Sequence, residues 1–546
     1  MNTLSTSLLY NKILNWSLLK EFTDKLSSKE VDFPCNLFGF QGGLQSFYLA
    51  DYVKRTGKDA VIVVPTEKEV TEIQTDLSVI APDLEVNVFP WFGTVPYRAV
   101  AKGSVVFGER AAVLAKLCSK TKKGRVFLMP QRAFQTPVPK PEYIQTLSVN
   151  IKSGAEIDSI KLAEHLAKHG YIRVPRVTVK GEFTLRGEVL DIFMPGEDFA
   201  HRIVFDFDTI SQIKVFDPET QSSRDVVDEL TIYPMKEIIW TDELVHGIEP
   251  KLKPFLNPVI GQDETGSVSV HDEQAFLEKA DSLLTELFVN HEAEGEELFF
   301  PLVFDEKYTV ADYLSEDDSL IFVDYDRLFY ADENFSREYL TLYRRERSDR
   351  PVPPPQVIFM SFQEVEEKHK KALRFRTILK EDVKNQTDFK IECDAPHSFF
   401  GNINFLKESL EGLLKENWQV FVFAGSENQA MRIEELLREQ KEAFGNNISV
   451  LSEPFSAGFG IPALKILVIQ ENEIFGRRKQ TPHSLKHAKS TVIDTFVELN
   501  PGDYVVHVNY GIGLFKGIER VKALGNERDY IKLEYEDQEI VFISIE

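Results

Sequence analysis

The sequence predicts a multidomain α/β protein: a parallel α/β domain carrying an inserted α+β domain, then a second, small α/β domain and a small C-terminal β-barrel. Three observations predict this fold class. The chain has 546 residues, which is enough for several domains that each bury a core. Short apolar runs alternate with amphipathic helical stretches over residues 35–130, and again after residue 390. From residue 499 the pattern is that of strands separated by glycine-containing turns.

Residues 35–130 have the pattern of a parallel sheet with crossover helices. Ala60–Val64 is a continuous apolar run, typical of a strand that is buried on both faces. Thr66 and Glu69 follow it at capping-box spacing. The helix they begin has apolar residues at positions 70, 73, 77 and 80, which places these residues on one face. Further strands are expected at 86–89 and 125–129, with a helix at 109–118 between them.

The next block predicts the inserted α+β domain. Residues 183–193 are rich in strand formers, and residues 202–208 alternate with a period of two. We expect Ile203, Phe205 and Phe207 to share one sheet face, against which a helix at 160–168 packs. A turn at 217–220 closes the block.

The rest of the chain divides into a mixed region, a small α/β domain, a connector and the β block. Residues 350–355 are proline-rich and predict a stiff connector before a strand at 357–360, although an SH3-type ligand is an alternative. In the small domain an apolar helical stripe (405, 406, 410, 413 and 414) precedes a strand at 420–423, and Ser426 is placed to cap the next helix. The expected boundaries are 1–135, 136–230, 231–375, 376–476, a connector at 477–498, and 499–546.

Composition excludes several classes of protein. There are 63 Lys and Arg against 87 Asp and Glu, a net charge of −24, which argues against a chain that mainly grips a phosphate backbone. Cys35, Cys118 and Cys393 are far apart, and the histidines form no ligand motif. We therefore expect no disulfide framework, no metal site and a cytoplasmic protein. No apolar run approaches the ~20 residues of a membrane span, and the N-terminus lacks an export signal.

Residues 38–46 stand where a phosphate-binding loop would precede the first helix of the α/β domain. Gly39, Gly42 and Gly43 are present, but Leu44 and Gln45 follow them. A working loop needs a lysine for the phosphates and a hydroxyl for magnesium at these places. We expect a degenerate loop, no catalytic residue and no cofactor in this chain. A nucleotide-dependent helicase with an atypical loop remains the alternative.

Three segments of the inserted block, at 181–193, 202–208 and 215–220, resemble the second domain of the excision-repair protein UvrB, which the bacterial transcription-repair coupling factors also carry. Residues 89–97 look like a segment of the first domain of the coupling factors, and residues 468–476 resemble the end of their small domain. UvrB's tyrosine-rich hairpin is missing, which favours the coupling factors. Residues 499–517 are similar to the RNA-polymerase-interacting domain that these factors share with CarD-type regulators.

The resemblance covers residues 25–546 in the order of the coupling-factor family. It implies a degenerate RecA-like first domain and an N-terminal fragment of a longer DNA-repair protein. The ATP- and magnesium-dependent translocase that handles DNA would lie beyond residue 546. Acting in transcription-coupled nucleotide excision repair, the fragment would be a scaffold that recruits repair proteins to stalled polymerase.

The resemblance also implies two docking surfaces. UvrA would bind Arg173 and Arg186, together with Arg202, Glu188 and Phe193, because guanidinium groups make bidentate bonds to carboxylates. Alternatively, Arg186 and Glu188 only pair with each other, and Phe193 is a core residue. The RNA polymerase β subunit would add a strand at a sheet edge that carries Val521 and Arg520, with Lys522 and Lys516 at its rim. Alternatively, Val521 points into the barrel. The basic residues of 477–489 leave direct DNA binding as a third possibility.

Overall fold

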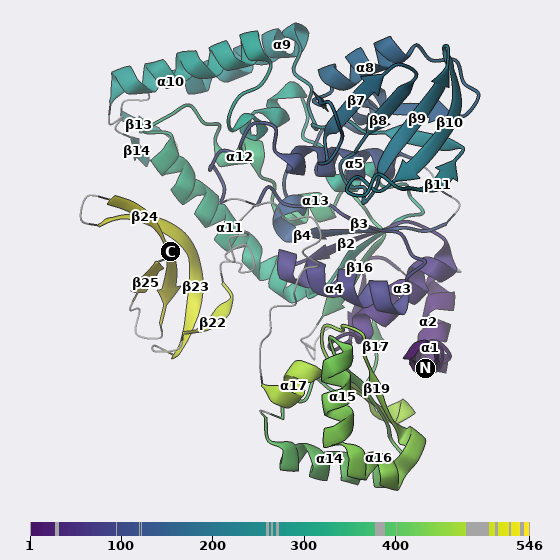
Figure 1. Cartoon of the computed structure of the whole chain (residues 1–546). Helices are drawn as coiled ribbons and strands as arrows, with labels where there is room; N and C mark the ends of the chain where they lie inside the picture. The colour runs from purple at the N-terminus through teal and green to yellow at the C-terminus, as the bar shows by residue number, and fades with distance from the viewer. Residues whose placement is uncertain are drawn as a thin grey trace.

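The structure is a computed structural model. It describes residues 2–27, 32–93, 95–119, 121, 123–257, 261–263, 266–268, 272–376, 388–399, 401–476, 502–507, 511–523, 526–535 and 540–544. Four larger sheets and two small two-stranded ones account for the strands in these ranges. Figure 1 shows them as separate layers, with the inserted domain at one end of the molecule and the small α/β domain at the other. The expected multidomain α/β class is confirmed.

A seven-stranded sheet, parallel throughout, forms the centre of the first domain. Its order is β17-β1-β16-β15-β2-β4-β3, so strands from before and after the insertion are mixed in one layer. The strands are β1 (Cys35–Phe38), β2 (Ala60–Val64), β3 (Val86–Val88), β4 (Val126–Pro130), β15 (Ser319–Phe322), β16 (Ala372–Arg376) and β17 (Phe389–Lys390). The helices that precede the inserted domain are α1 (Asn2–Leu14), α2 (Ser17–Ser27), α3 (Leu44–Thr56), α4 (Glu67–Ile80), α5 (Val105–Cys118), α6 (Gln131–Phe134) and α7 (Pro141–Leu147). The predicted parallel sheet is confirmed.

Local sequence explains how β2 leads into α4. All five residues of β2 are buried. Thr66 then caps α4, and Glu69 returns its side chain to the Thr66 amide, so the predicted capping box is present. The predicted apolar face of the helix is buried as well. One acidic residue, Asp76, is buried beside that face.

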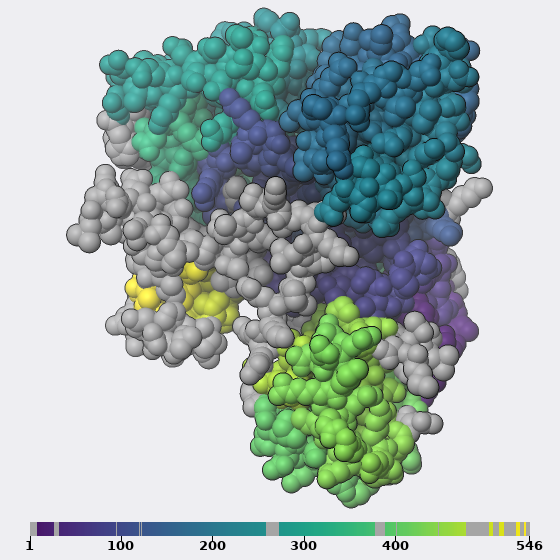
Figure 2. All heavy atoms as spheres, viewed as in Figure 1, coloured from purple at the N-terminus to yellow at the C-terminus, as the bar shows by residue number. Residues whose placement is uncertain are grey.

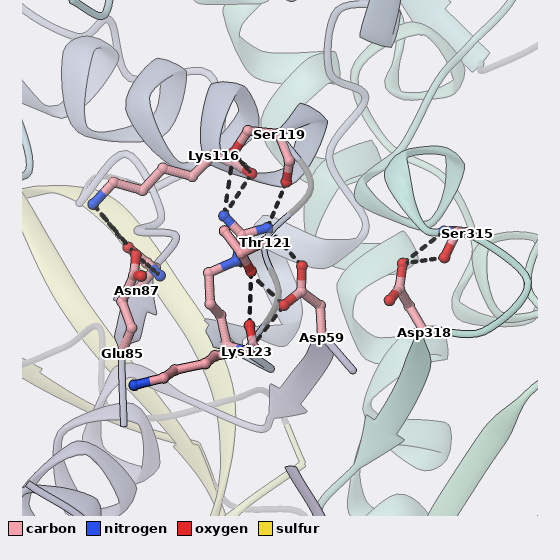
Figure 3. A network of polar contacts seen from close by, with 10 residues as sticks. Asp59, Glu85, Asn87, Lys116, Ser119, Thr121, Lys123, Ser315 and Asp318 are labelled. Atoms are coloured by element: carbon pink, nitrogen blue, oxygen red, sulfur yellow. Dashed lines mark hydrogen bonds and ion pairs between the residues drawn. The ribbon is translucent and has the colours of Figure 1, made fainter. Parts of the chain in front are cut away.

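Arg125 ties the start of β4 to the end of α5. Its side chain is only 4% exposed and donates to both carboxylate oxygens of Asp59, at 3.2 and 2.6 Å. It also donates to the carbonyl oxygens of Lys116 and Ser119, at 2.9 and 2.7 Å, which lie at the helix C-terminus where carbonyls lack a partner in the next turn. Figure 3 shows this network, with the Lys116 side chain extending away from it toward Asn87. Arg125 thus bonds two carbonyl oxygens at the C-terminus of α5 and, at the same time, the carboxylate of Asp59, which directly precedes β2.

A mostly helical region follows the inserted domain and packs around a core of its own. It contains α9 (Asp242–Leu256), α10 (Glu273–Thr285), α11 (Tyr325–Glu346), α12 (Pro355–Ile358), α13 (Phe362–Glu366) and the short pair β13 (Gly261–Asp263) and β14 (Gly266–Val268). The strand predicted at 357–360 is wrong, because α12 occupies its start and prolines precede the helix. The proline-rich connector is packed inside, since Val352 is buried and Pro353 accepts a hydrogen bond from the Tyr97 hydroxyl.

The inserted domain is a six-stranded sheet covered on one face by α8 (Ser159–Lys168). Ile203 and Phe205 pack with Leu162 and Leu166 of that helix, as predicted. Phe207 does not join them: it lies in the turn after β9 with φ of +54° and is 84% exposed. The strand ends at Asp206, two residues earlier than the alternation over 202–208 suggested. The sheet order is β11-β10-β9-β8-β7-β6, with strands β6 (Ile172–Arg173), β7 (Glu182–Arg186), β8 (Val189–Ile192), β9 (Ala200–Asp206), β10 (Thr209–Phe216) and β11 (Ser223–Val227), flanked by the pair β5 (Val149–Lys152) and β12 (Glu229–Ile232).

The small α/β domain forms a distinct lobe in the space-filling view (Figure 2). Its sheet order is β19-β18-β21-β20. Ser426 caps α15 as predicted. Leu406, Leu410 and Leu414 are buried, whereas Phe405 of the predicted stripe is 51% exposed. The elements are α14 (Ile403–Lys415), β18 (Gln419–Phe423), α15 (Glu427–Leu436), α16 (Arg438–Phe444), β19 (Ile448–Leu451), β20 (Phe459–Ile461), β21 (Ile466–Gln470) and α17 (Glu471–Phe475).

The C-terminal module is an antiparallel sheet in the order β22-β23-β24-β25. Its strands are β22 (Tyr504–His507), β23 (Gly511–Ala523), β24 (Asn526–Glu534) and β25 (Ile540–Ser544). The expected all-β block is therefore present, while closure into a barrel stays a prediction. No described helix combines the length and apolarity needed to cross a membrane. The basic connector at 477–498 lies outside the described residues.

Candidate docking surfaces

The inserted domain presents a polar sheet face on the side away from α8. Strand register places Asp191 beside Arg202 and Arg202 beside Lys214, while Arg186 lies further along the same face. Neighbouring residues in each strand, such as Leu190 and Ile203, point to the opposite face and into the core under α8. The arginine face, defined by Arg186, Asp191, Arg202 and Lys214, is therefore produced by the same alternation that builds the core.

Arg202 is held rigidly on this face. It donates from Nε and Nη2 to the two carboxylate oxygens of Asp191, at 2.7 and 2.9 Å. Its guanidinium also lies over the Phe216 ring, 4.8 Å from the centroid. Asp191 is nearly buried and Arg202 is 27% exposed. The pair keeps Arg202 charged and fixed in place, with only part of the guanidinium available to a partner.

Arg186 and Glu188 flank Gly187 in the tight turn between β7 and β8, and both are exposed. No ion pair joins them, so in the described chain the local pairing that sequence reasoning left open is not formed. Arg173 is exposed at the end of the edge strand β6, where its guanidinium makes one long hydrogen bond, 3.4 Å, to the Leu185 carbonyl. Arg173 and Arg186 can therefore reach an incoming carboxylate without first breaking an ion pair to another described residue.

Phe193 requires a correction. It is 3% exposed and packs with Val177, Ala200 and Phe216 in a small cluster. Phe193 is therefore a core residue that supports the strands of this domain, and it offers no contact surface. The remaining candidate contacts are the exposed Arg173, Arg186 and Glu188 and the partly exposed Arg202. Arg186 and Arg202 share the arginine face, whereas the register of β6 with β7 places Arg173 opposite Phe183, which belongs to the core under α8.

The C-terminal module offers a backbone edge rather than a cluster of side chains. A bulge at Lys516 interrupts the pairing of β23 with β24, and Gly517 has φ of +119°. Beyond the bulge, residues 517–523 pair with β24 on one side, and no other described strand pairs with their second side. An unpaired strand edge of this kind can add a strand from another protein.

The predicted polymerase contacts lie along this strand. Lys516 is half-buried and forms an ion pair of 2.5 Å with Glu534. In the backbone register Val521 stands opposite Arg528, between Arg520 and Lys522. The side chains of these three predicted residues lie outside the described part of the structure, so the face that Val521 takes stays a prediction.

Residues 38–46, predicted as a degenerate phosphate loop, are approached closely by residues 455–458 of the small α/β domain. The Gly43 amide, which would face a phosphate in a working loop, donates to the Ala457 carbonyl at 3.0 Å. A Cβ on Gly42 would lie 2.0 Å from the Gly458 oxygen, and one on Gly43 would lie 2.3 Å from the Phe455 ring. Gly39 is equally crowded, since a Cβ there would lie 2.0 Å from the Ile391 oxygen. Gly42 and Gly43 thus let residues 455–458 approach the loop closely.

Two carboxylates, the buried Asp76 and the partly buried Glu473, hold residues 455–458 in place, and sequence reasoning missed both. Asp76 accepts from the Ser456 amide and hydroxyl and from the Ser46 hydroxyl. Glu473 accepts from the Gly458 amide at 2.6 Å. Burial raises the pKa of each carboxyl to about 7. An acidic residue beside the apolar stripe of the 67–80 helix was the one available signal for Asp76.

Two known protein families match parts of this chain, and the matches coincide with the two candidate docking surfaces. The family described as the UvrB interaction domain matches residues 149–238, which contain the arginine face. The family described as the CarD-like/TRCF RID domain matches residues 499–546, the C-terminal module. In the described ranges, no group of three or more His, Cys, Asp or Glu side chains is arranged to hold a metal ion.

Similarity to individual proteins extends along almost the whole chain. The chain is 28% identical to the transcription-repair-coupling factor of Borreliella burgdorferi over 97% of its length. It is 24% identical to that of Staphylococcus epidermidis and 22% identical to that of Bacillus subtilis, each over 93%. It spans 44% of the length of each of these relatives. The resemblance to the coupling factors found in the sequence is confirmed.

Proposed function

We propose that this chain is the partner-binding scaffold of a transcription-repair coupling factor. It would recruit UvrA through Arg173 on the edge strand β6 and through the arginine face of the inserted domain. It would dock on the β subunit of stalled RNA polymerase through the C-terminal module. The observation that carries the proposal is the presence of both family matches, in this order, on one chain that is similar to coupling factors over 97% of its length.

The geometry of the inserted domain supports the first contact. Arg173 and Arg186 are exposed and free of ion pairs among the described residues, and Arg202 is braced by Asp191. Guanidinium groups presented from sheet strands, rather than from long loops, can bind partner carboxylates with little loss of side-chain entropy.

Binding of purified UvrA to the full chain tests this contact. We expect the double variant Arg173→Ala/Arg186→Ala to bind at least about tenfold more weakly, as expected for the loss of charge-assisted hydrogen bonds. Lys161→Ala is the matched control, because this exposed lysine lies on α8, which covers the face of the sheet opposite Arg186 and the arginine face. Equal binding by the double variant would rule out this surface as the UvrA site.

The open edge of β23 supports the second contact, because strand addition needs an unpaired row of backbone groups. A fragment of the polymerase β subunit should bind the full chain and lose this binding when residues 499–546 are removed. Retained binding after the deletion would exclude the module as the docking site.

A nucleotide-dependent helicase is the second candidate. The Gly43–Ala457 hydrogen bond and the close approach of Phe455 argue against it, because they occupy the place of the phosphates. We propose that ATP-driven work on DNA belongs to the remaining length of such proteins. Calorimetric titration of this chain with ATP and magnesium should give no stoichiometric binding, and saturable binding at one site per chain would favour the helicase.

A further inference from the structure

Arg327, near the start of α11, connects two parts of the chain that are 176 residues apart. Its Nε and Nη2 donate to the two carboxylate oxygens of Asp503 in the C-terminal module, at 2.8 and 2.6 Å. Its third nitrogen, Nη1, donates to Glu69 of α4 at 2.6 Å. The three side chains are only 29%, 13% and 19% exposed in the order Arg327, Asp503 and Glu69. This bidentate pair is therefore largely shielded from water, where charge-assisted bonds are stronger than at an open surface.

The core holds Arg327 ready for a carboxylate. One oxygen of Glu69 accepts from the Thr66 amide as part of the α4 capping box, and its other oxygen accepts from Arg327. Glu69 is thus fixed by the helix that it caps, and it fixes the guanidinium in turn. The Nε–Nη2 edge of Arg327 is left facing outward, with the geometry that matches one carboxylate.

The backbone of the C-terminal module also fits against α11, in addition to the charge of Asp503. Asp503 is held to β23, because its carbonyl accepts from the Phe515 amide at 2.8 Å. A Cβ on Gly502 would lie 2.6 Å from the Asn334 amide nitrogen, and one on Gly517 would lie 3.9 Å from the Glu338 carboxylate. Gly502 therefore lets the module lie close against Asn334 of α11, and Gly517 lies at ordinary van der Waals distance from the same helix. Figure 1 shows the four-stranded module beside this helix.

The contacted residues form one stripe of α11. Arg327, Asn334 and Glu338 are separated by seven and four positions, which places them on the same side of a helix. The stripe extends toward the bulge at Lys516, where the open edge of β23 begins.

We infer that this stripe of α11 is an intramolecular docking site for the C-terminal module, with Asp503 as the bound carboxylate. The docked position holds Gly517, the first residue of the open edge, against α11. Resting on the proposed function, the inference adds a regulatory step: polymerase gains full access to the edge when the module leaves α11. Docking on α11 and polymerase binding then compete, so weakening the Arg327–Asp503 ion pair gives tighter polymerase binding.

Asp503→Asn in the full chain is the informative variant. It removes the charge from the module side and leaves the Arg327–Glu69 pair of the core intact. Arg327→Ala is the second variant, and Arg337→Ala is the matched control, because Arg337 pairs with Glu333 on the exposed side of the same helix. Spin labels on cysteines introduced at Thr341 of α11 and Ile540 of β25 report the distance between helix and module, with Cys118 and Cys393 replaced by serine.

We expect one narrow distance distribution in the parent chain and in Arg337→Ala, and a broader, longer one in Asp503→Asn and Arg327→Ala. Affinity for the polymerase β fragment should rise by up to about tenfold in Asp503→Asn and Arg327→Ala. This is the factor by which a docked state that holds most of the molecules lowers the apparent affinity. Identical distance distributions in all four proteins would overturn the docking site. Broadened distances with unchanged polymerase affinity would overturn the competition. If no protein binds the polymerase fragment, the proposed function fails, while the distances still decide whether the module docks on α11.

Discussion

Asp76 of α4 accepts hydrogen bonds from both the amide and the hydroxyl of Ser456, at 2.8 and 2.7 Å, although the two residues are 380 positions apart in the chain. The Ser46 hydroxyl donates to the same carboxyl group at 2.9 Å. The Asp76 side chain is 1% exposed and lies where residues 455–458 approach residues 38–46, the predicted degenerate phosphate loop. A helix of the first domain thereby fixes the segment of the small domain that closes the loop.

Replacing Asp76 by asparagine should change how stability depends on pH. Burial raises the pKa of Asp76 in the folded protein to about 7, above the ordinary value of 3.8. The folded state therefore binds the Asp76 proton more tightly than the unfolded state does. The contribution of this proton to the free energy of unfolding is complete at low pH and is lost as the pH rises from about 4 to about 7. Relative to Asp76→Asn, the parent chain should lose roughly 1–4 kcal/mol of unfolding free energy across this range.

Urea denaturation of both proteins at several pH values measures this difference. The comparison with Asp76→Asn is essential, because His201 titrates in the opposite sense. Burial lowers the pKa of His201 to about 4, which reduces stability in acid. Two stability profiles that stay parallel between pH 4 and pH 7 would contradict the prediction.

Gly43→Ala should be destabilising, mainly because of a steric clash with the Phe455 ring. Gly43 has an ordinary φ of −71°, which alanine adopts freely, but the new Cβ would lie 2.3 Å from the Phe455 ring. Forcing an extra methyl group into a packed site costs roughly 1–3 kcal/mol. A Phe455→Ala background removes this clash and leaves only the Ala457 carbonyl oxygen, 3.1 Å from the new Cβ. The two changes together should therefore cost less than the sum of their separate effects.

Chemical denaturation of the four members of this cycle provides the test. Gly412→Ala is the control, since a Cβ there meets nothing within 4 Å and the residue lies inside α14. It should be neutral or stabilising, by up to about 1 kcal/mol. Strict additivity in the cycle would show that the Phe455 ring is not what excludes a side chain at position 43.

The elements that sequence reasoning predicted correctly depend on residues close together in the chain. The strand Ala60–Val64, the Thr66–Glu69 capping box and the cap at Ser426 each follow from spacings of a few residues. The inserted sheet was predicted from the alternation of apolar and polar residues along its strands. This alternation places one set of side chains in the core and the other set on the arginine face. The strand predicted at 357–360 failed because a short apolar run has the same appearance in a strand and in a buried turn of helix.

The features that could not be predicted depend on distant partners. Nothing near Asp76 in the sequence indicates Ser456, and nothing near Arg327 indicates Asp503. Arg202 was predicted as a contact from the resemblance to the second domain of UvrB, and the structure adds that Asp191 braces it. Phe193 was misplaced for a related reason, because its burial depends on Phe216 of another strand. Residue type and spacing indicate which chemistry a residue can perform, whereas its partners are set by the tertiary fold.

Arg110 and Glu237 offer a test of a buried ion pair that joins α5 to the segment after β12. The two side chains are 0% and 2% exposed, and Arg110 also donates to the Pro90 carbonyl at 2.8 Å. Arg110→Ala should destabilise the protein by roughly 3–5 kcal/mol, because it leaves a buried acid without its partner. Arg110→Met combined with Glu237→Gln should recover much of this loss, as measured by thermal unfolding. A double variant no more stable than Arg110→Ala would mean that packing of the guanidinium on Phe89 and Phe92, at 4.1 and 4.2 Å, dominates instead.

Phe207→Asn should stabilise the protein, although it removes an aromatic residue. Phe207 has φ of +54° in the turn between β9 and β10 and is 84% exposed, so its ring gains little from packing. The left-handed conformation costs an ordinary L-residue roughly 1–2 kcal/mol, and asparagine tolerates it better. We expect the midpoint of urea denaturation to rise, with a gain of about 0.5–1 kcal/mol in unfolding free energy. Phe207→Ala keeps the strained backbone and removes only the ring, so it should give no such gain. Equal stabilisation by alanine and asparagine would show that exposure of the ring, rather than the backbone conformation, is the source of the cost.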